Sequence, residues 1–121
     1  MQRRPERKVL ILTGRLCAPR IRESLGGLNA EVLELPLDVA CLMTSALIRS
    51  ELAHRDLSRY IFALVPGGMR ENLKDLERTL ELPFYLGPIH FSDIRLVLDN
   101  LDEEQLSRAS PADLVIRDLS A

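Results

Sequence analysis

Two kinds of hydrophobic pattern, one typical of strands and one typical of helices, follow each other in turn along the chain. Short segments rich in branched or aromatic apolar residues predict strands, and these segments cover residues 8–12, 30–36, 60–65 and 82–86. Elsewhere apolar residues recur every three or four positions, which predicts helices at residues 16–25, 44–57, 71–80 and 92–98 and a last helix starting at residue 110. Thr44, Ser92 and Ser110 stand where three of these helices begin, and their side chains are suited to N-capping.

The alternation of strands and helices predicts an α/β fold. Runs 8–12 and 60–65 are apolar throughout, which is typical of parallel strands buried on both faces. Run 30–36 alternates apolar and acidic residues, which indicates a strand at the edge of the sheet. We therefore predict a three-layer α/β/α sandwich with a flavodoxin- or Rossmann-like parallel sheet. The sheet has four or five strands in the order 2-1-3-4, with the fifth near residues 105–107.

Length and composition narrow the class of protein. The 121 residues fit one α/β domain, with residues 1–7 as a flexible basic tail. A net charge of −2 argues against nucleic acid and acidic membranes as partners. No stretch approaches the roughly 20 apolar residues of a membrane span, and no signal-peptide pattern opens the chain, so we expect a cytoplasmic protein. Cys17 and Cys41 fit reduced thiols outside any metal-binding spacing, and we expect neither a metal nor a cofactor.

Glycine-rich and polar turns follow the predicted strands. Parallel strands place their carboxyl ends on one rim, where open α/β sheets bind ligands near the switch point, here between the first and third strands. The residues that we predict for a ligand site on this rim are Thr13, Gly14, Arg15, Asp38, Gly67, Gly68, Arg70 and His90. Arg15 and Arg70 follow the first and third strands, so we expect them close together, where two guanidinium groups near helix N-termini would suit a phosphate or carboxylate.

Each of these residues also has a purely structural explanation. Glycines are ordinary turn residues, the two arginines can pair with nearby carboxylates such as Asp38, and a histidine at a strand end is often a hydrogen-bonding structural residue. No catalytic set can be assembled from the sequence, which lacks G-x-x-x-x-G-K-[ST], G-x-G-x-x-G and a nucleophile elbow. What favours a ligand site is the common placement of these residues on one rim.

Four stretches of the chain, taken together, point to a known family. They are VLILTGRL at residues 9–16, LPLDVACLMT at 35–44, VPGGMR at 65–70, and LGPIH at 86–90 continued by LVLDNL at 96–101. In order and spacing they resemble the N-terminal domain of the archaeal dihydropteroate synthase-related proteins. The resemblance extends from about Lys8 to the last predicted helix.

The resemblance implies a domain that precedes a pterin-binding barrel in proteins linked to tetrahydromethanopterin biosynthesis. It implies no synthase activity for this chain, which contains none of the barrel, and it leaves open whether the chain is one part of a longer protein or a stand-alone relative. Two positions depart from the expected pattern. Ile89 stands where a basic residue is expected, and Asn72 stands where a glycine-like turn is expected. If the rim of the family binds an anion, these departures imply that this chain binds it more weakly or not at all.

Two classes of function stay open. The first is a non-catalytic accessory or regulatory domain, with a pterin-binding barrel as its partner in cis or in trans and a small anion at the rim. The second is a small enzyme acting on a phosphorylated metabolite, in which Arg15 and Arg70 hold the anion and His90 is the acid or base. The second requires these three residues to converge on one cavity. Flavodoxin-like or corrinoid cofactor binding is disfavoured, because the hydroxyl-rich loop and the D-x-H-x-x-G signature are missing. The oligomeric state stays open, a homo-oligomer included.

Overall fold

The computed structural model describes residues 8–38 and 43–120. The predicted basic tail (1–7) and Cys41 lie outside these residues. The strands are β1 (Lys8–Thr13), β2 (Ala30–Glu34), β3 (Tyr60–Val65) and β4 (Phe84–Leu86). The helices are α1 (Ala18–Ser24), α2 (Ser45–Leu52), α3 (Leu73–Leu80), α4 (Ile94–Asn100) and α5 (Ala112–Ser120), with two 3₁₀ helices at Phe91–Asp93 and Glu103–Gln105. Strands and helices alternate through β4, as predicted.

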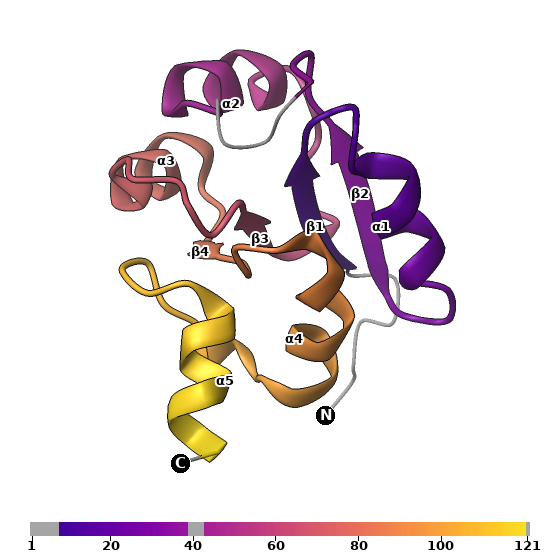
Figure 1. Cartoon of the computed structure of the whole chain (residues 1–121). Coiled ribbons are helices and arrows are strands. Elements are labelled where there is room, and N and C mark those ends of the chain that lie inside the picture. Colours follow the sequence, from indigo (N-terminus) through magenta and orange to yellow (C-terminus); the bar gives the residue numbers. More distant parts are fainter. Residues whose placement is uncertain (1–7, 39–42, 121) are drawn as a thin grey trace, which may run out of the picture.

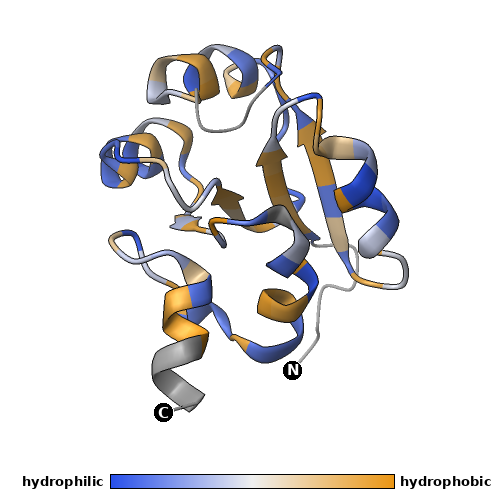
Figure 2. Ribbon diagram, in the orientation of Figure 1, coloured by the Kyte–Doolittle hydropathy of each residue, from blue (hydrophilic) through white to orange (hydrophobic). Residues whose placement is uncertain are grey.

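The four strands form one parallel sheet in the order β2-β1-β3-β4. This confirms the predicted flavodoxin- or Rossmann-like order 2-1-3-4. The continuous apolar strands β1 and β3 lie in the middle of the sheet, and the alternating strand β2 lies at an edge. Figure 2 shows the central strands β1 and β3 in hydrophobic colours, whereas hydrophilic residues interrupt β2 and the helices.

Helices cover both faces of the sheet and give it two hydrophobic cores (Figure 1). Leu10 and Leu12 of β1 belong to the core under α2 and α3, where Leu73 and Leu76 of α3 are buried. Ile11, the residue between them, belongs to the opposite core, which α1, α4 and α5 complete. This alternation follows from the strand geometry, in which successive side chains point to opposite faces.

One residue of β3 is exposed, although burial was predicted for the whole strand. Lys8 pairs with Tyr60, whereas Val9 pairs with Phe62, so the register shifts by one residue and skips Ile61. Ile61 is exposed, although the whole run 60–65 was expected to be buried. An extra residue in one strand of a pair is a bulge, which leaves that residue outside the regular alternation.

Of the four or five strands predicted, the described sheet has four, and residues 105–107 do not form a fifth. The Asp102 N–H donates to the Gln105 side chain in a capping box, and this turns the chain into the 3₁₀ helix Glu103–Gln105. One backbone hydrogen bond of 2.8 Å, from Leu86 N–H to the Ser107 carbonyl, still ties this segment to the free edge of β4.

The helix starts were predicted with mixed success. Thr44 is the N-cap of α2 and accepts from Leu47 N–H, as expected. Ser92 lies within the 3₁₀ helix Phe91–Asp93 rather than at the start of α4. Ser110 precedes a helix that begins at Ala112, because the Pro111 carbonyl accepts the first bonds, from Leu114 and Val115.

Two other helices are shorter than predicted. The second helix ends at Leu52 rather than near residue 57, because the Asp56 carboxylate accepts from both the N–H and the hydroxyl of Ser58 and forms a turn there. The third begins at Leu73 rather than at Glu71, because Asn72 caps it by accepting from Lys74 N–H. Within the part of the chain that the structure describes, no helix is long and apolar enough to cross a membrane.

Candidate functional site

The carboxyl ends of the strands form a rim at which two loops diverge. The loop after β1 leads to α1 on one face of the sheet, and the loop after β3 leads to α3 on the other face. Since β1 and β3 are neighbours, the rim between them is the topological switch point, where open α/β sheets bind their ligands.

A pocket of about 240 Å³ lies at this switch point. Its walls are mainly aliphatic side chains of the core shared by α1 and α4: Ile11, Ile21, Leu64 and Ile94. Three polar side chains line it as well, Thr13 at the end of β1, Cys17 before α1, and His90 after β4. Thr13 is only 3% exposed, whereas His90 is exposed. Two of the predicted site residues, Thr13 and His90, therefore share the switch-point pocket.

Gly14, Arg15 and Asp38 belong to a separate contact between the loops after β1 and β2. Arg15 N–H donates to the Leu37 carbonyl at 2.8 Å, and the Arg15 guanidinium pairs with the Asp38 carboxylate at 3.1 Å. A Cβ atom on Gly14 would lie 2.8 Å from the Asp38 carbonyl oxygen, so a glycine is needed for this close approach. Of the explanations left open by the sequence, the structure supports the ion pair for Arg15 and backbone packing for Gly14.

Gly67, Gly68 and Arg70 line a second hollow, of about 500 Å³, on the loop after β3. Gly67 is buried against the loop after β4, and its N–H donates to the Pro88 carbonyl at 3.2 Å. Arg70 is exposed, and among the described residues its guanidinium makes no hydrogen bond or ion pair. Arg108, from the segment before α5, lines the same hollow. The sequence did not indicate Arg108, because it lies in an irregular stretch with no motif.

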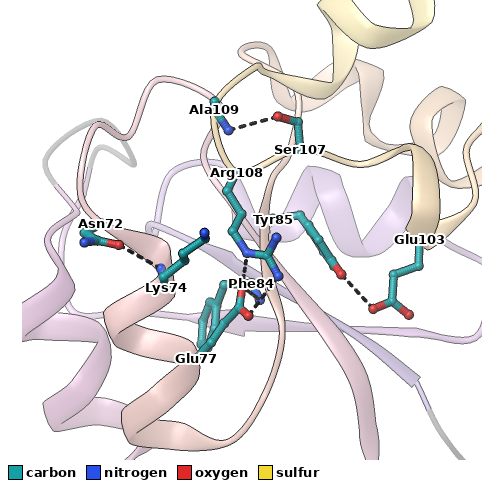
Figure 3. Close-up of polar contacts among 9 residues, drawn as sticks. All are labelled: Asn72, Lys74, Glu77, Phe84, Tyr85, Glu103, Ser107, Arg108 and Ala109. Atoms are coloured by element: carbon teal, nitrogen blue, oxygen red, sulfur yellow. Dashed lines mark hydrogen bonds and ion pairs between the residues drawn. The ribbon is translucent and has the colours of Figure 1, made fainter.

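Arg108 is held by a network of side chains from α3 and β4 (Figure 3). Its guanidinium donates two hydrogen bonds to the Glu77 carboxylate and lies over the Tyr85 ring, 5.1 Å from the centroid. Glu77 also accepts from Phe84 N–H at 3.2 Å, and the Tyr85 hydroxyl donates to Glu103 at 2.8 Å. These contacts fasten the segment before α5 to the β4 edge.

The pKa values of this network follow from the same contacts. Partial burial opposes ionisation of Glu77, but the hydrogen bonds from Arg108 and Phe84 outweigh it and lower the pKa of the carboxyl. Burial, helped by the hydrogen bond to Glu103, raises the pKa of Tyr85 to about 12. Arg108 thus has a fixed counter-ion, and Arg70 is the cation of this hollow that has none among the described residues.

The three residues required by the enzyme hypothesis do not line one common pocket among the described residues. Arg15 pairs with Asp38 in the loop contact beside β2, Arg70 lines the hollow beyond β3, and His90 lines the switch-point pocket. Arg15, expected close to Arg70, is not among the residues that line the hollow of Arg70. Among the described residues, no group of three His, Cys, Asp or Glu side chains could hold a metal ion.

The strand order and this rim define an open parallel α/β domain of the flavodoxin- or Rossmann-like class with a small pocket at its switch point. The chain belongs to a family of unknown function, DUF6513, which matches residues 7–89. It is also 28% identical over 120 residues to the uncharacterised protein MJ0107 of Methanocaldococcus jannaschii. That alignment covers 93% of this chain and 23% of the relative, so the chain spans less than a quarter of the relative's length.

The family match includes only part of the rim. Residues 7–89 include all four strands, the switch-point threonine Thr13 and the Arg70 loop, whereas His90, Arg108, α4 and α5 follow the matched stretch. Neither the family nor the relative names an activity. The resemblance to dihydropteroate synthase-related proteins therefore stays a prediction.

Proposed function

We propose that this chain is a non-catalytic accessory domain that binds a small anionic molecule at the rim of its sheet through Arg70. The observation that carries the proposal is the position of the Arg70 guanidinium. It lies on the loop after a central strand, beside the switch point, in a hollow and without a partner among the described residues. A guanidinium in this position can bind a phosphate or carboxylate through two parallel hydrogen bonds.

The charges around the hollow favour an anion at Arg70 over the other candidates. Glu71 also lines the hollow, but its carboxylate accepts from Ser45 N–H at 2.7 Å, at the N-terminus of α2. Arg108 also lines the hollow, but its guanidinium is paired with the Glu77 carboxylate. Arg15 has Asp38 as its counter-ion. Arg70 is thus the basic group of the predicted site that can bind an anion without first breaking an ion pair.

The arrangement of the rim favours binding over catalysis. General acid–base catalysis needs the acid or base within hydrogen-bond reach of the reacting group. Here His90 lines the switch-point pocket and Arg70 lines the other hollow, and Ile89 contributes to both. His90 is therefore not among the residues that line the hollow in which Arg70 would bind an anion.

Anion binding can be tested by replacing Arg70 with alanine and measuring thermal unfolding in phosphate and in chloride of equal ionic strength. The native chain should be stabilised by phosphate in a saturable way, by about 1.4 kcal/mol at ten times the dissociation constant. The Arg70→Ala variant should bind phosphate at least tenfold more weakly. The matched control is Arg78→Ala, which removes an exposed arginine paired with Asp75 on α3 and should leave phosphate binding unchanged. Equal phosphate binding by the native chain and Arg70→Ala would contradict the proposal.

We further propose that the partner is a pterin-binding barrel, in cis or in trans, and that the domain acts in the cytoplasm. This rests on the sequence resemblance, and exposed apolar side chains support a docking role. Leu96 and Leu114 are 48% and 37% exposed on α4 and α5, and Ile89 beside them is 52% exposed. Figure 2 shows a hydrophobic band on α5. Sedimentation of the chain mixed with a dihydropteroate synthase-type barrel should reveal a complex that a Leu96→Ser/Leu114→Ser variant does not form. No complex with the native chain would count against this partner.

A further inference from the structure

The switch-point pocket differs chemically from the hollow at Arg70. Lysine, arginine, aspartate and glutamate side chains are absent from its described lining, and its walls are mainly aliphatic. An anion placed there would lose its hydration without meeting a countercharge. This pocket therefore suits an uncharged molecule, and it requires an explanation separate from the anion site.

Thr13 supplies the pocket with a buried polar group. On β1 it follows Ile11 by two residues, so its side chain points to the same face as Ile11, toward α1 and α4. Thr13 is only 3% exposed as a residue and lines the pocket, and no hydrogen bond joins its hydroxyl to another described residue. A hydroxyl both donates and accepts hydrogen bonds, so one that lines the pocket without a protein partner is suited to bind a polar group of a ligand.

The volume limits the size of that ligand. A closed apolar cavity of about 150 Å³ is enough to hold benzene. At about 240 Å³, the switch-point pocket has room for two fused rings. The aliphatic side chains on its walls would contact the faces of such a ring system, and His90 and Cys17 stand among the lining residues as further polar contacts.

We propose that the switch-point pocket is a second binding site, which takes a small uncharged one- or two-ring compound carrying one hydrogen-bonding group. The rings lie among Ile11, Ile21, Leu64 and Ile94, and the polar group bonds to the Thr13 hydroxyl. This site is independent of anion binding at Arg70, because the two sites share only Ile89 among the residues that line them.

The test uses 2-naphthol and naphthalene as probes, with binding followed by NMR of the isoleucine and leucine methyl groups. Both probes should shift the methyl signals of Ile11, Ile21, Leu64 and Ile94 in a saturable way, with 2-naphthol binding more tightly. Thr13→Val, which removes the hydroxyl and keeps the shape, should weaken 2-naphthol binding about tenfold and leave naphthalene unchanged. Naphthalene-2-sulfonate, an anion of the same ring system, should bind at least tenfold more weakly than 2-naphthol.

Two more variants complete the experiment. Cys17→Phe enlarges a half-buried side chain at the pocket and should abolish binding of both probes, which keeps the test informative if Thr13→Val fails to fold. Arg70→Ala should change neither probe, so failure of the anion site and failure of this site are distinguishable. The proposal is overturned if no methyl group shifts saturably, if the shifts fall on Leu96 and Leu114 instead, or if Thr13→Val weakens both probes equally.

Discussion

Gly67 offers a sharp test of how the loops after β3 and β4 are held together. A Cβ atom at this position would lie 2.5 Å from the Gly87 carbonyl oxygen and 2.7 Å from Ile89 N. Both are backbone atoms, so no side-chain rotation can relieve the overlap. Gly68, the next residue, has nothing within 4 Å of the same added atom and does not have a positive φ. The two glycines are therefore a matched pair that differs in the space around one methyl group.

The loss of stability in Gly67→Ala can be estimated from the shift of the two loops that the added methyl group requires. Relieving the overlap separates the loops and strains two backbone hydrogen bonds, Gly67 N–H to Pro88 at 3.2 Å and Gly87 N–H to Val65 at 2.8 Å. Overpacking of a buried site costs about 1–3 kcal/mol, and each weakened bond adds up to about 1 kcal/mol. We expect Gly67→Ala to lower the free energy of unfolding by about 2–4 kcal/mol.

Gly68→Ala is the control. It should be neutral or stabilising by up to about 1 kcal/mol, because alanine restricts the unfolded chain without strain in the folded one. Urea unfolding followed by circular dichroism measures both variants under the same conditions, with the midpoint and the slope fitted separately. Equal stability of the two variants would refute the argument that Gly67 is required by the close approach of the two loops.

Two further predictions concern ionisable groups. Burial raises the pKa of Tyr60 and Tyr85 to about 12, so both contribute stability that is complete below pH 10, their ordinary pKa, and is lost as the pH rises to 12. Unfolding measured across this range should show a smaller loss in a variant with phenylalanine at both positions; an unchanged loss would contradict the assignment. Glu77→Gln should destabilise the fold by about 1–2 kcal/mol through its partly exposed bonds to Arg108, while the exposed Glu104→Gln should not. The pKa of Glu77 is lowered from its ordinary value of 4.5, so the difference between Glu77→Gln and the native chain should begin to shrink below about pH 4.5, where the unfolded chain takes up the proton. It should be lost once the pH falls through the lower pKa of the native carboxyl. A difference that persists at pH 2 would show that the ion pair is not its source.

Much of the fold could be predicted because it depends on local patterns of burial. The unbroken apolar runs of β1 and β3 require cover on both faces, which only central strands receive, and the alternation in β2 matches an edge. The helix ends were less predictable. Asp56 and Asn72 decide where two helices stop and start through single side-chain bonds that compete with other capping choices nearby.

The candidate site was predictable in its location but not in its contacts. Rim placement follows from the strand order, so the loops carrying Thr13, Arg70 and His90 could be located from the sequence. Which residues face one another could not, because that depends on how loops distant in sequence approach. Arg108 reaches Glu77 across 31 positions, and nothing in its own segment indicates that pairing.

By itself, the sequence determined the sheet order and the rim on which a ligand would bind. The reason is that both follow from the hydrophobic pattern, which depends only on the order of residues in the chain. Only the tertiary structure decided the chemistry of that rim. It pairs Arg15 with Asp38, leaves Arg70 without a partner among the described residues, and places Thr13 in the lining of a mainly aliphatic pocket. The physical reason is that charge and hydrogen bonding act over a few ångströms in space, and the folded chain alone sets those distances.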